Sequence, residues 1–218
     1  MMQRTVERFR KRVILIHWLH ASSFFVLLIT GALMFFNLTD FNGGQQIRFV
    51  HKIAAGFFVI VPAIFSLAHP KTALSFLKDG FRWERDDITW LKLSLGYYFG
   101  AQKKMPLQDR INGDQKLWQL MSIISGIVFT TTGITLWFFK MEIPVLLYQW
   151  VLLVHAAAFI VAMVFFLIHF YLRTLYPGFE ESLSSMLDGR VSESYARKNY
   201  SKWYDNIMGK KKDINPGE

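Results

Sequence analysis

Four long apolar blocks are the feature that most constrains how this chain can fold. Each is long enough to cross the roughly 30 Å hydrocarbon core of a bilayer as an α-helix, which takes about 20 residues. A soluble helical bundle is the alternative, but its helices would each carry a polar face, and residues 145–172 carry none. We therefore expect an all-α membrane protein, a four-transmembrane-helix bundle with helices at about 13–36, 48–69, 117–139 and 145–172.

The positions of Lys and Arg predict which way these helices face. Five such residues lie in 1–12, nine in 70–116 and eight in 173–218, against none in 37–47 and one in 140–146. Because Lys and Arg accumulate on the cytoplasmic side of membrane proteins, we expect both termini, the loop 70–116 and the tail 173–218 to be cytoplasmic. The same count explains the net charge of +9, which would otherwise suggest binding to nucleic acid or to a lipid surface. No nucleic-acid motif accompanies it, and the lipid bilayer is expected as a partner because of the four spans.

The first apolar block follows five basic residues, as in a secretory signal peptide. It is too long for one and is followed by no small-residue cleavage site, so we expect a retained helix. The polar segments 70–116 and 173–218 lack repeats and are too short to enclose a sizeable core. We expect them to form short amphipathic pieces at the cytoplasmic surface. Residues 1–218 would then make a single multi-pass membrane domain.

The absence of cysteine narrows the possible redox chemistry. It excludes a disulfide framework, an iron–sulfur cluster bound by the chain itself and a covalently attached C-x-x-C-H haem. The sequence also has no glycine-rich dinucleotide loop, nucleophile elbow or pair of catalytic carboxylates. Any redox function therefore needs a non-covalent cofactor held by other side chains.

Four histidines lie at two matching depths in the predicted helices. His17 and His169 each lie about one turn inside the cytoplasmic ends of their helices, whereas His51 and His155 lie in the outer half of the bundle. From His155 to His169 the fourth helix advances 14 residues (169 − 155), or about 21 Å with an angular offset of about 40°. Two neutral imidazoles can fill both axial positions of a haem iron. The pattern predicts two haems that only transfer electrons, whereas a hydrogen-bonded helix contact is the alternative for any single histidine.

Two further histidines and four glycines are open to more than one interpretation. His20 follows His17 by three residues and is a possible rival ligand, which we place beside the haem instead. His69 stands at the cytoplasmic mouth of the second helix, where an interfacial histidine is ordinary and a part in proton traffic is the alternative. Glycines within the helices either let helices approach or make room for a flat macrocycle: Gly31, Gly56, Gly126 and Gly133.

Six short motifs run along almost the whole chain: IHW at 16–18, INGDQK at 111–116, VHAAA at 154–158, LIHFY at 167–171, MLDGRVS at 186–192 and KWY at 202–204. Together they resemble the cytochrome b (gamma) subunit of respiratory membrane-bound formate dehydrogenases. The resemblance implies two b-type haems, one held by His17 and His169 and the other by His51 and His155. It also implies a location in the bacterial inner membrane, periplasmic iron–sulfur and catalytic subunits as partners, and menaquinone reduced near the cytoplasmic haem.

The same resemblance implies that the loop before the third helix binds quinone. The family has an Asn and a Gln in a stretch that reads roughly Y-N-x-G-Q-K, and here Asn112, Gln115 and Lys116 match it. Ile111 replaces the Tyr, and Asp114 replaces the second Gly. An amide can donate a hydrogen bond to a quinone carbonyl, and Asp114 could deliver protons. The alternative is that this stretch is only a turn and helix cap.

The function that follows is electron transfer from an iron–sulfur partner through two haems to menaquinone. The chain carries no group that could oxidise formate, so we expect a non-catalytic subunit of a quinone-reducing complex. A cytochrome b subunit of a membrane-bound nickel–iron hydrogenase, or of a related periplasmic oxidoreductase, is the alternative within this class. A haem-free membrane anchor is the alternative from another class.

Overall fold

The computed structural model describes residues 4–38, 40–102 and 104–214 and is mostly helical. Position 103 of the predicted loop and positions 215–218 of the predicted tail lie outside the described residues. The chain divides into two compact units. The transmembrane unit comprises Leu15–Ala73 and Met121–His169, and the polar unit comprises Met1–Ile14, Leu74–Leu120 and Phe170–Glu218.

Four long helices correspond to the four apolar blocks: α1 (Lys11–Phe35), α2 (Phe41–Ala68), α5 (Gly113–Phe138) and α6 (Val145–Phe170). Each is long and apolar enough to span a bilayer, which confirms the predicted four-helix membrane fold. Helix α2 begins seven residues before position 48 (48 − 41). Its first turn is capped by Asp40, whose carboxylate accepts a hydrogen bond of 2.6 Å from the Gly43 N–H, so the helix extends into polar residues that hydropathy does not detect. The orientation of the termini stays a prediction.

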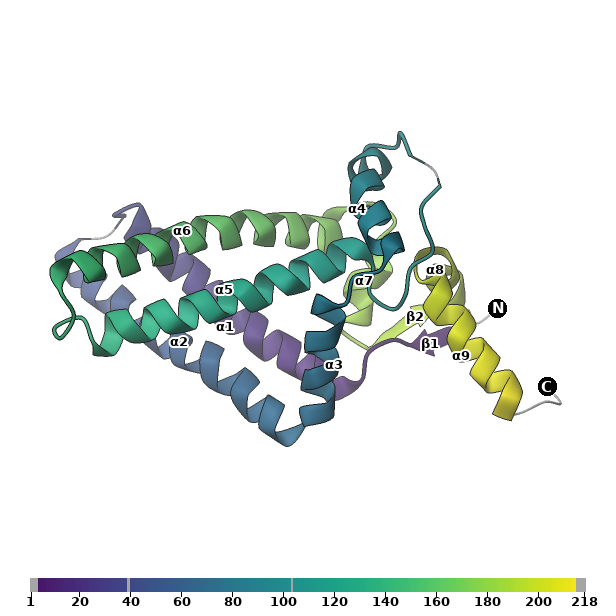
Figure 1. Cartoon of the computed structure of the whole chain (residues 1–218), viewed down its shortest axis with the longest axis horizontal. Coiled ribbons are helices and arrows are strands. Elements are labelled where there is room, and N and C mark those ends of the chain that lie inside the picture. Colours follow the sequence, from purple (N-terminus) through teal and green to yellow (C-terminus); the bar gives the residue numbers. More distant parts are fainter. Residues whose placement is uncertain (1–3, 39, 103, 215–218) are drawn as a thin grey trace. The chain divides into compact units, whose positions relative to one another are not determined.

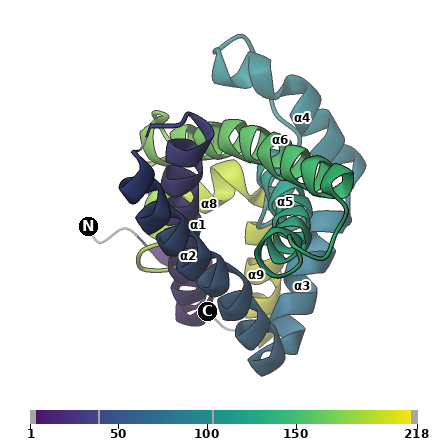
Figure 2. The same cartoon turned by 90° about the vertical axis from the view of Figure 1, so that its left-hand side faces the viewer.

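Aromatic contacts join helices within the transmembrane unit. Helix α1 lies beside α2, and α5 lies beside α6, in both views of the fold (Figure 1, Figure 2). Rings from α1 and α6 meet at Phe24 and Phe166, with centroids 5.3 Å apart, and at Phe35 and Phe159, 5.6 Å apart. Few of the described side chains in this unit are buried, and they include Ser23, Thr30, Ala54, Phe58, Thr132, Phe159 and Ala162. These helices therefore lack the densely filled core of a soluble bundle.

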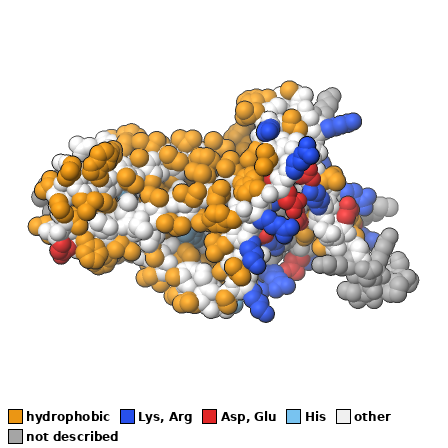
Figure 3. Space-filling model, viewed as in Figure 1, with side chains coloured by type: hydrophobic (Ala, Val, Ile, Leu, Met, Phe, Trp, Pro, Cys, Tyr) orange, Lys and Arg blue, Asp and Glu red, His pale blue; other side chains and the backbone are white. Residues whose placement is uncertain are grey.

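The outer surface of the same helices is apolar. Hydrophobic side chains cover them in the space-filling view (Figure 3), and many large ones are exposed, among them Leu15, Phe57, Ile64, Ile127, Leu153 and Leu167. An apolar surface of this extent would promote association in water, whereas lipid tails solvate it. The surface agrees with a multi-pass location in the inner membrane.

The shorter elements belong to the polar unit, apart from the first turn of α3. They are β1 (Thr5–Glu7), α3 (Pro70–Phe81), α4 (Arg85–Tyr98), the π-helical segment η1 (Tyr171–Leu175), α7 (Glu180–Ser185), β2 (Arg190–Ser192), α8 (Glu193–Asn199) and α9 (Ser201–Ile214). Lys and Arg side chains gather over this unit, together with Asp and Glu (Figure 3).

A two-stranded sheet brings the start of the chain to the turn within the MLDGRVS motif. Strands β1 and β2 pair antiparallel, with Val6 opposite Val191. The turn before β2 requires Gly189, whose φ is +85° and whose added Cβ would collide with the carbonyl oxygen of Phe9. The Gly189 carbonyl also accepts hydrogen bonds from the Arg8 and Phe9 N–H groups, at 2.8 and 3.1 Å. The positive φ and the close contact with Phe9 thus explain why the motif has glycine at this position.

The polar unit has a hydrophobic core of its own, built from Val6, Val191, Tyr195, Ala196, Tyr200 and Tyr204. Five of these six residues come from the segment 173–218 and the sixth, Val6, comes from the start of the chain. The expectation that the segment 173–218 forms only short amphipathic pieces is therefore wrong. The organisation of residues 1–218 as one di-haem domain stays a prediction.

Candidate functional site

The predicted outer histidine pair meets within the transmembrane unit. The imidazole centroids of His51, on α2, and His155, on α6, lie 6.5 Å apart, with an angle of 67° between the ring planes. An imidazole nitrogen binds a metal at about 2 Å and lies roughly 1 Å from its ring centroid, so two imidazoles on opposite sides of one metal ion have centroids roughly 6 Å apart. The observed spacing therefore fits two ligands of a single iron.

Each ring of this pair is held by a threonine from the preceding helix. Nδ1 of His51 lies 2.8 Å from Thr30 Oγ1, on α1, and Nδ1 of His155 lies 2.7 Å from Thr132 Oγ1, on α5. Among the described residues, no hydrogen bond is made by Nε2 of either ring. The nitrogen that a metal would need is thus available on both histidines.

The helix glycines leave space rather than close contacts. A Cβ added at Gly133 would lie 3.8 Å from Cε1 of His155, and one added at Gly31 would lie 3.4 Å from the Phe159 ring and 3.8 Å from Cε1 of His51, which are ordinary contact distances. A Cβ added at Gly56 or Gly126 would meet no atom within 4 Å. Glycine within a helix costs about 1 kcal/mol relative to alanine, and close helix packing does not explain it at Gly56 and Gly126. The open surfaces fit a flat macrocycle lying against the helices.

The inner histidine pair also lies in the transmembrane unit. His17, on α1, meets Trp18 edge-to-face with centroids 5.4 Å apart, and His169 lies in the last turn of α6. Both side chains are partly buried. Their pairing across one haem stays a prediction that rests on their matching depths.

The two remaining histidines differ in their surroundings. His20 stacks on Phe58 with centroids 4.4 Å apart, and its Nδ1 is buried without a hydrogen-bond partner among the described residues. His69 caps the end of α2, where its ring meets Phe65 edge-to-face at 5.0 Å. The cap uses the backbone N–H of His69, so the role of its imidazole stays a prediction.

The candidate quinone loop forms a reciprocal cap at the start of α5. The side chain of Asn112 accepts a hydrogen bond of 3.3 Å from the Gln115 N–H, and the Gln115 side chain accepts one of 3.2 Å from the Asn112 N–H. The Gln115 oxygen also accepts a hydrogen bond of 3.1 Å from the Arg8 guanidinium. Only 3% of Asn112 is exposed. The helix-cap interpretation thus describes both side-chain oxygens, and among the described residues neither side-chain amide donates a hydrogen bond.

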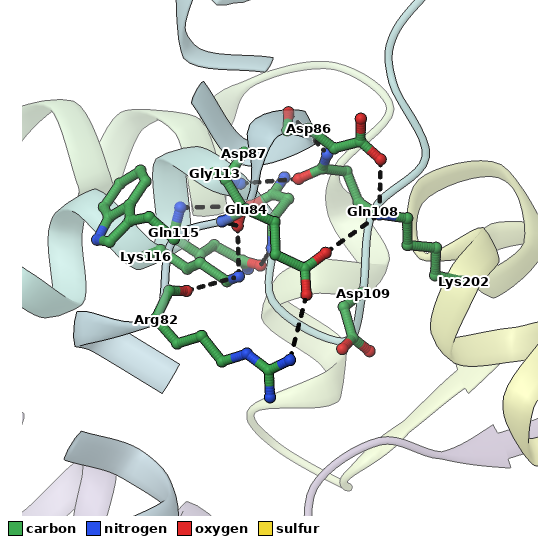
Figure 4. Close-up of polar contacts among 12 residues, drawn as sticks. Arg82, Glu84, Asp86, Asp87, Gln108, Asp109, Gly113, Gln115, Lys116 and Lys202 are labelled. Carbon is green, nitrogen blue, oxygen red and sulfur yellow. Dashed lines mark hydrogen bonds and ion pairs between the residues drawn. The ribbon is translucent and has the colours of Figure 1, made fainter. Parts of the chain in front are cut away.

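A buried network clamps the same loop against α4 (Figure 4). The Gly113 N–H donates to Gln108 Oε1 at 2.9 Å, and Lys116 Nζ lies 2.6 Å from the Asp87 carboxylate, with a 3.3 Å bond to the Arg82 carbonyl. A Cβ at Gly113 would lie 2.6 Å from the Asp87 carbonyl oxygen, so the loop approaches α4 as closely as glycine allows. Sequence reasoning placed Lys116 in the loop but could not identify Asp87 as its partner.

Asp114, which replaces a glycine of the family pattern, is held by two partners within the polar unit. Its carboxylate pairs with the Arg173 guanidinium and accepts a hydrogen bond of 2.9 Å from the Tyr98 hydroxyl. Burial, together with the charge of Asp114, raises the pKa of Tyr98 well above its ordinary value, so this hydroxyl keeps its proton. One oxygen of Asp114 is buried without a hydrogen-bond partner among the described residues. Sequence reasoning gave Arg173 no role, because nothing in its local pattern indicates a partner 59 residues away.

Comparisons with known proteins agree with these features. The family described as prokaryotic cytochrome b561 matches residues 8–189. The cytochrome b556 subunit of the nitrate-inducible formate dehydrogenase of Escherichia coli (strain K12) is 29% identical over 200 residues, which cover 88% of this chain and 86% of the relative. The formate dehydrogenase cytochrome b556 subunit of Haemophilus influenzae is 25% identical over 192 residues, or 86% and 77% of the two chains. These matches confirm the resemblance to formate dehydrogenase cytochrome b subunits.

Proposed function

Because the chain belongs to the prokaryotic cytochrome b561 family, it is a membrane cytochrome b with an electron-transfer role, and we propose that it carries electrons through two b-type haems to menaquinone. Electrons enter from an iron–sulfur subunit of a formate dehydrogenase on the periplasmic side. Menaquinone is reduced on the cytoplasmic side and takes its protons there. The chain itself oxidises no formate.

The 6.5 Å spacing of the His51 and His155 rings is the observation that carries this proposal. These two residues hold the periplasmic haem, each through the Nε2 atom that its Nδ1 contact leaves available. A bound haem supplies one-electron transfer, and two axial imidazoles leave no coordination position open for oxygen or substrate. The chain's own contribution is to fix both ligands on rigid helices and to surround them with apolar side chains.

His17 and His169 hold the second haem in the same way. His169 follows His155 on α6 by 14 residues (169 − 155), which places the two ligands about 21 Å apart along the helix. Lys and Arg lie mostly in the segments before α1, between α2 and α5 and after α6, so these segments and both termini face the cytoplasm. The haem of His17 and His169 is then the cytoplasmic one.

Menaquinone binds at the loop that begins α5. The amide groups of Asn112 and Gln115 donate hydrogen bonds to a quinone carbonyl, since their oxygens already serve the helix cap. Asp114, at the same loop, delivers protons to the quinone from the cytoplasmic side. Two of the chain's features support this assignment: the resemblance of the loop to the family pattern and the amide donors that the cap leaves unused.

The partner proteins are the iron–sulfur and catalytic subunits of a formate dehydrogenase. Both relatives are named as subunits of that enzyme, which favours a formate dehydrogenase over a hydrogenase as electron donor. Membership of a cytochrome family disfavours a haem-free anchor.

The proposed path is tested in inner-membrane vesicles that contain the assembled complex. Formate should reduce the b-type absorbance bands of the chain, and a menaquinone analogue added afterwards should reoxidise them. If formate leaves the bands oxidised although an artificial reductant reduces them, the donor assignment is wrong. If the analogue fails to reoxidise them, the acceptor assignment is wrong.

A further inference from the structure

The same contact occurs twice in the transmembrane unit. On α1, Thr30 lies 2.8 Å from Nδ1 of His51, and on α5, Thr132 lies 2.7 Å from Nδ1 of His155. In each case a threonine on one helix of a hairpin holds a histidine on the next helix. Both threonines are among the few buried residues of this unit, and each is followed by glycine.

A backbone carbonyl oxygen near each threonine decides whether the threonine or the histidine donates the proton in these contacts. Thr30 Oγ1 lies 2.7 Å from the Val26 carbonyl oxygen, and Thr132 Oγ1 lies 2.6 Å from the Val128 carbonyl oxygen. Two oxygens at such a distance need a proton between them, and the carbonyl has none to give. The threonine hydroxyl therefore donates to its own helix. Its oxygen is left as an acceptor.

The proton in the threonine–histidine contact must then come from the imidazole. Each histidine carries its proton on Nδ1 and donates it to the threonine, so Nε2 has a lone pair for a metal. The reverse arrangement, with the hydroxyl donating to Nδ1, would leave two oxygens in repulsive contact at 2.6–2.7 Å.

We infer that Thr30 and Thr132 are positioning residues that set the tautomer, orientation and basicity of two haem ligands. The inference rests on the proposed function, in which His51 and His155 bind one haem. A hydrogen-bond acceptor at the far nitrogen of a histidine ligand fixes its tautomer and strengthens its electron donation to the metal. Stronger donation stabilises the ferric state, so both threonines lower the reduction potential of the same haem.

Thr131 offers a matched control next to Thr132. Its hydroxyl donates to the Ile127 carbonyl at 2.9 Å, as Thr132 donates to its own helix, but its side chain is exposed and contacts no histidine. Replacing Thr131 by valine removes a hydroxyl from the same helix, as Thr132→Val does, but leaves the contact between Thr132 and His155 in place.

Redox titration of the purified complex, followed by optical and electron paramagnetic resonance spectra, tests the inference. The variants are Thr30→Val, Thr132→Val, Thr132→Ser and the control Thr131→Val. Each of the first two should shift the one-electron equilibrium of the same haem toward its reduced form by up to about tenfold, or about 59 mV. The other haem should keep its potential. Thr132→Ser, which retains a hydroxyl, and Thr131→Val should leave both potentials unchanged.

The outcomes separate this inference from the proposed haem pairing. If both valine variants kept both haems with unchanged potentials and spectra, the threonines would have no positioning role, and the pairing would stand. If each valine variant moved a different haem, the threonine role would stand and the pairing of His51 with His155 would be wrong. Loss of a haem in Thr132→Val with its return in Thr132→Ser would also support the inference. Equal shifts in Thr132→Ser and Thr132→Val would contradict it.

Discussion

The imidazole rings of His51 and His155 lie 6.5 Å apart although 104 residues (155 − 51) separate them in the chain. They come from different helices, α2 and α6, and each Nδ1 contacts a threonine on the helix that precedes its own. Packing of the apolar helices thus creates a ligand pair whose spacing suits one iron. The proposed ligation of one haem by this pair rests on this relationship.

Breaking the Asp114–Arg173 ion pair should destabilise the polar unit. Both side chains are largely buried, so Asp114→Asn leaves a buried guanidinium without its counter-charge. Removing one partner of a buried pair typically costs about 3–5 kcal/mol, measurable as a lower free energy of unfolding in detergent. The control is Arg82→Gln, which breaks an exposed 3.8 Å pair with Glu84 and should cost less than about 1 kcal/mol. Equal effects of the two changes would show that Asp114 and Arg173 are solvated.

Removing an amide donor from the candidate quinone loop should slow quinone reduction. In Asn112→Ala or Gln115→Ala, loss of one hydrogen bond should weaken quinone binding by about 0.5–1.5 kcal/mol, seen as a raised KM for a menaquinone analogue. Both haems should still be reduced by the donor. These variants also lose a helix cap, so Asp40→Ala, which removes the cap of α2, is the control and should leave the KM unchanged. Normal quinone kinetics in both loop variants would make the loop a structural cap only.

The attachment of α9 to α4 should weaken in alkali. Lys202 lies 2.6 Å from the Asp86 carboxylate and 3.3 Å from that of Glu84, and the hydrogen bond to Asp86 is the main cause of its raised pKa. A raised pKa in the folded state means that the contribution is complete below the ordinary lysine pKa of about 10.4 and is lost as the pH rises through the higher folded value. Because the pair is partly exposed, the contribution is at most about 1 kcal/mol.

Hydrogen exchange of the α9 amides measures this effect. Protection, corrected for intrinsic exchange, should fall above about pH 10 and should be insensitive to pH in Lys202→Gln. The prediction fails if the wild-type chain and the variant lose protection in parallel.

Reporter fusions test the orientation of the helices. Green fluorescent protein fused after Glu218 should fluoresce, and alkaline phosphatase at the same point should be inactive, because the Lys and Arg distribution places this end in the cytoplasm. Alkaline phosphatase inserted after Leu38, between α1 and α2, should be active. The opposite pattern at both positions would reverse the topology and place the His17–His169 haem on the periplasmic side.

The four helices and the depth of each histidine within its helix could be predicted from sequence, because each depends on position along a single helix. A membrane span needs a continuous apolar run, and depth follows from residue number at a fixed rise. The helix starts were less accurate, since α2 and α5 extend into polar residues capped by Asp40 and Asn112. Hydropathy detects only the apolar part of a helix, so it misses a first turn made of polar residues.

Contacts between distant segments of the polar unit could not be predicted. The three-residue pairing of Val6 with Val191 is too short to give a strand pattern, and the Asp114–Arg173 pair joins residues whose local sequences give no sign of each other. Thr30 and Thr132 were missed for a related reason, although a threonine–glycine pair within two apolar helices was visible in the sequence. A polar side chain repeated beside a small residue in two membrane helices is the signal that could have found them.

The ratio of haem to protein in the purified chain and its histidine variants tests the central claim most directly. The account predicts two b-type haems in the unsubstituted chain and in the control His69→Ala, whose ring meets that of Phe65 at a helix end among the described residues. It predicts one haem in His155→Ala and one in His169→Ala, with the remaining haem differing between the two. A single haem in the unsubstituted chain, or two haems retained in both His155→Ala and His169→Ala, would contradict it.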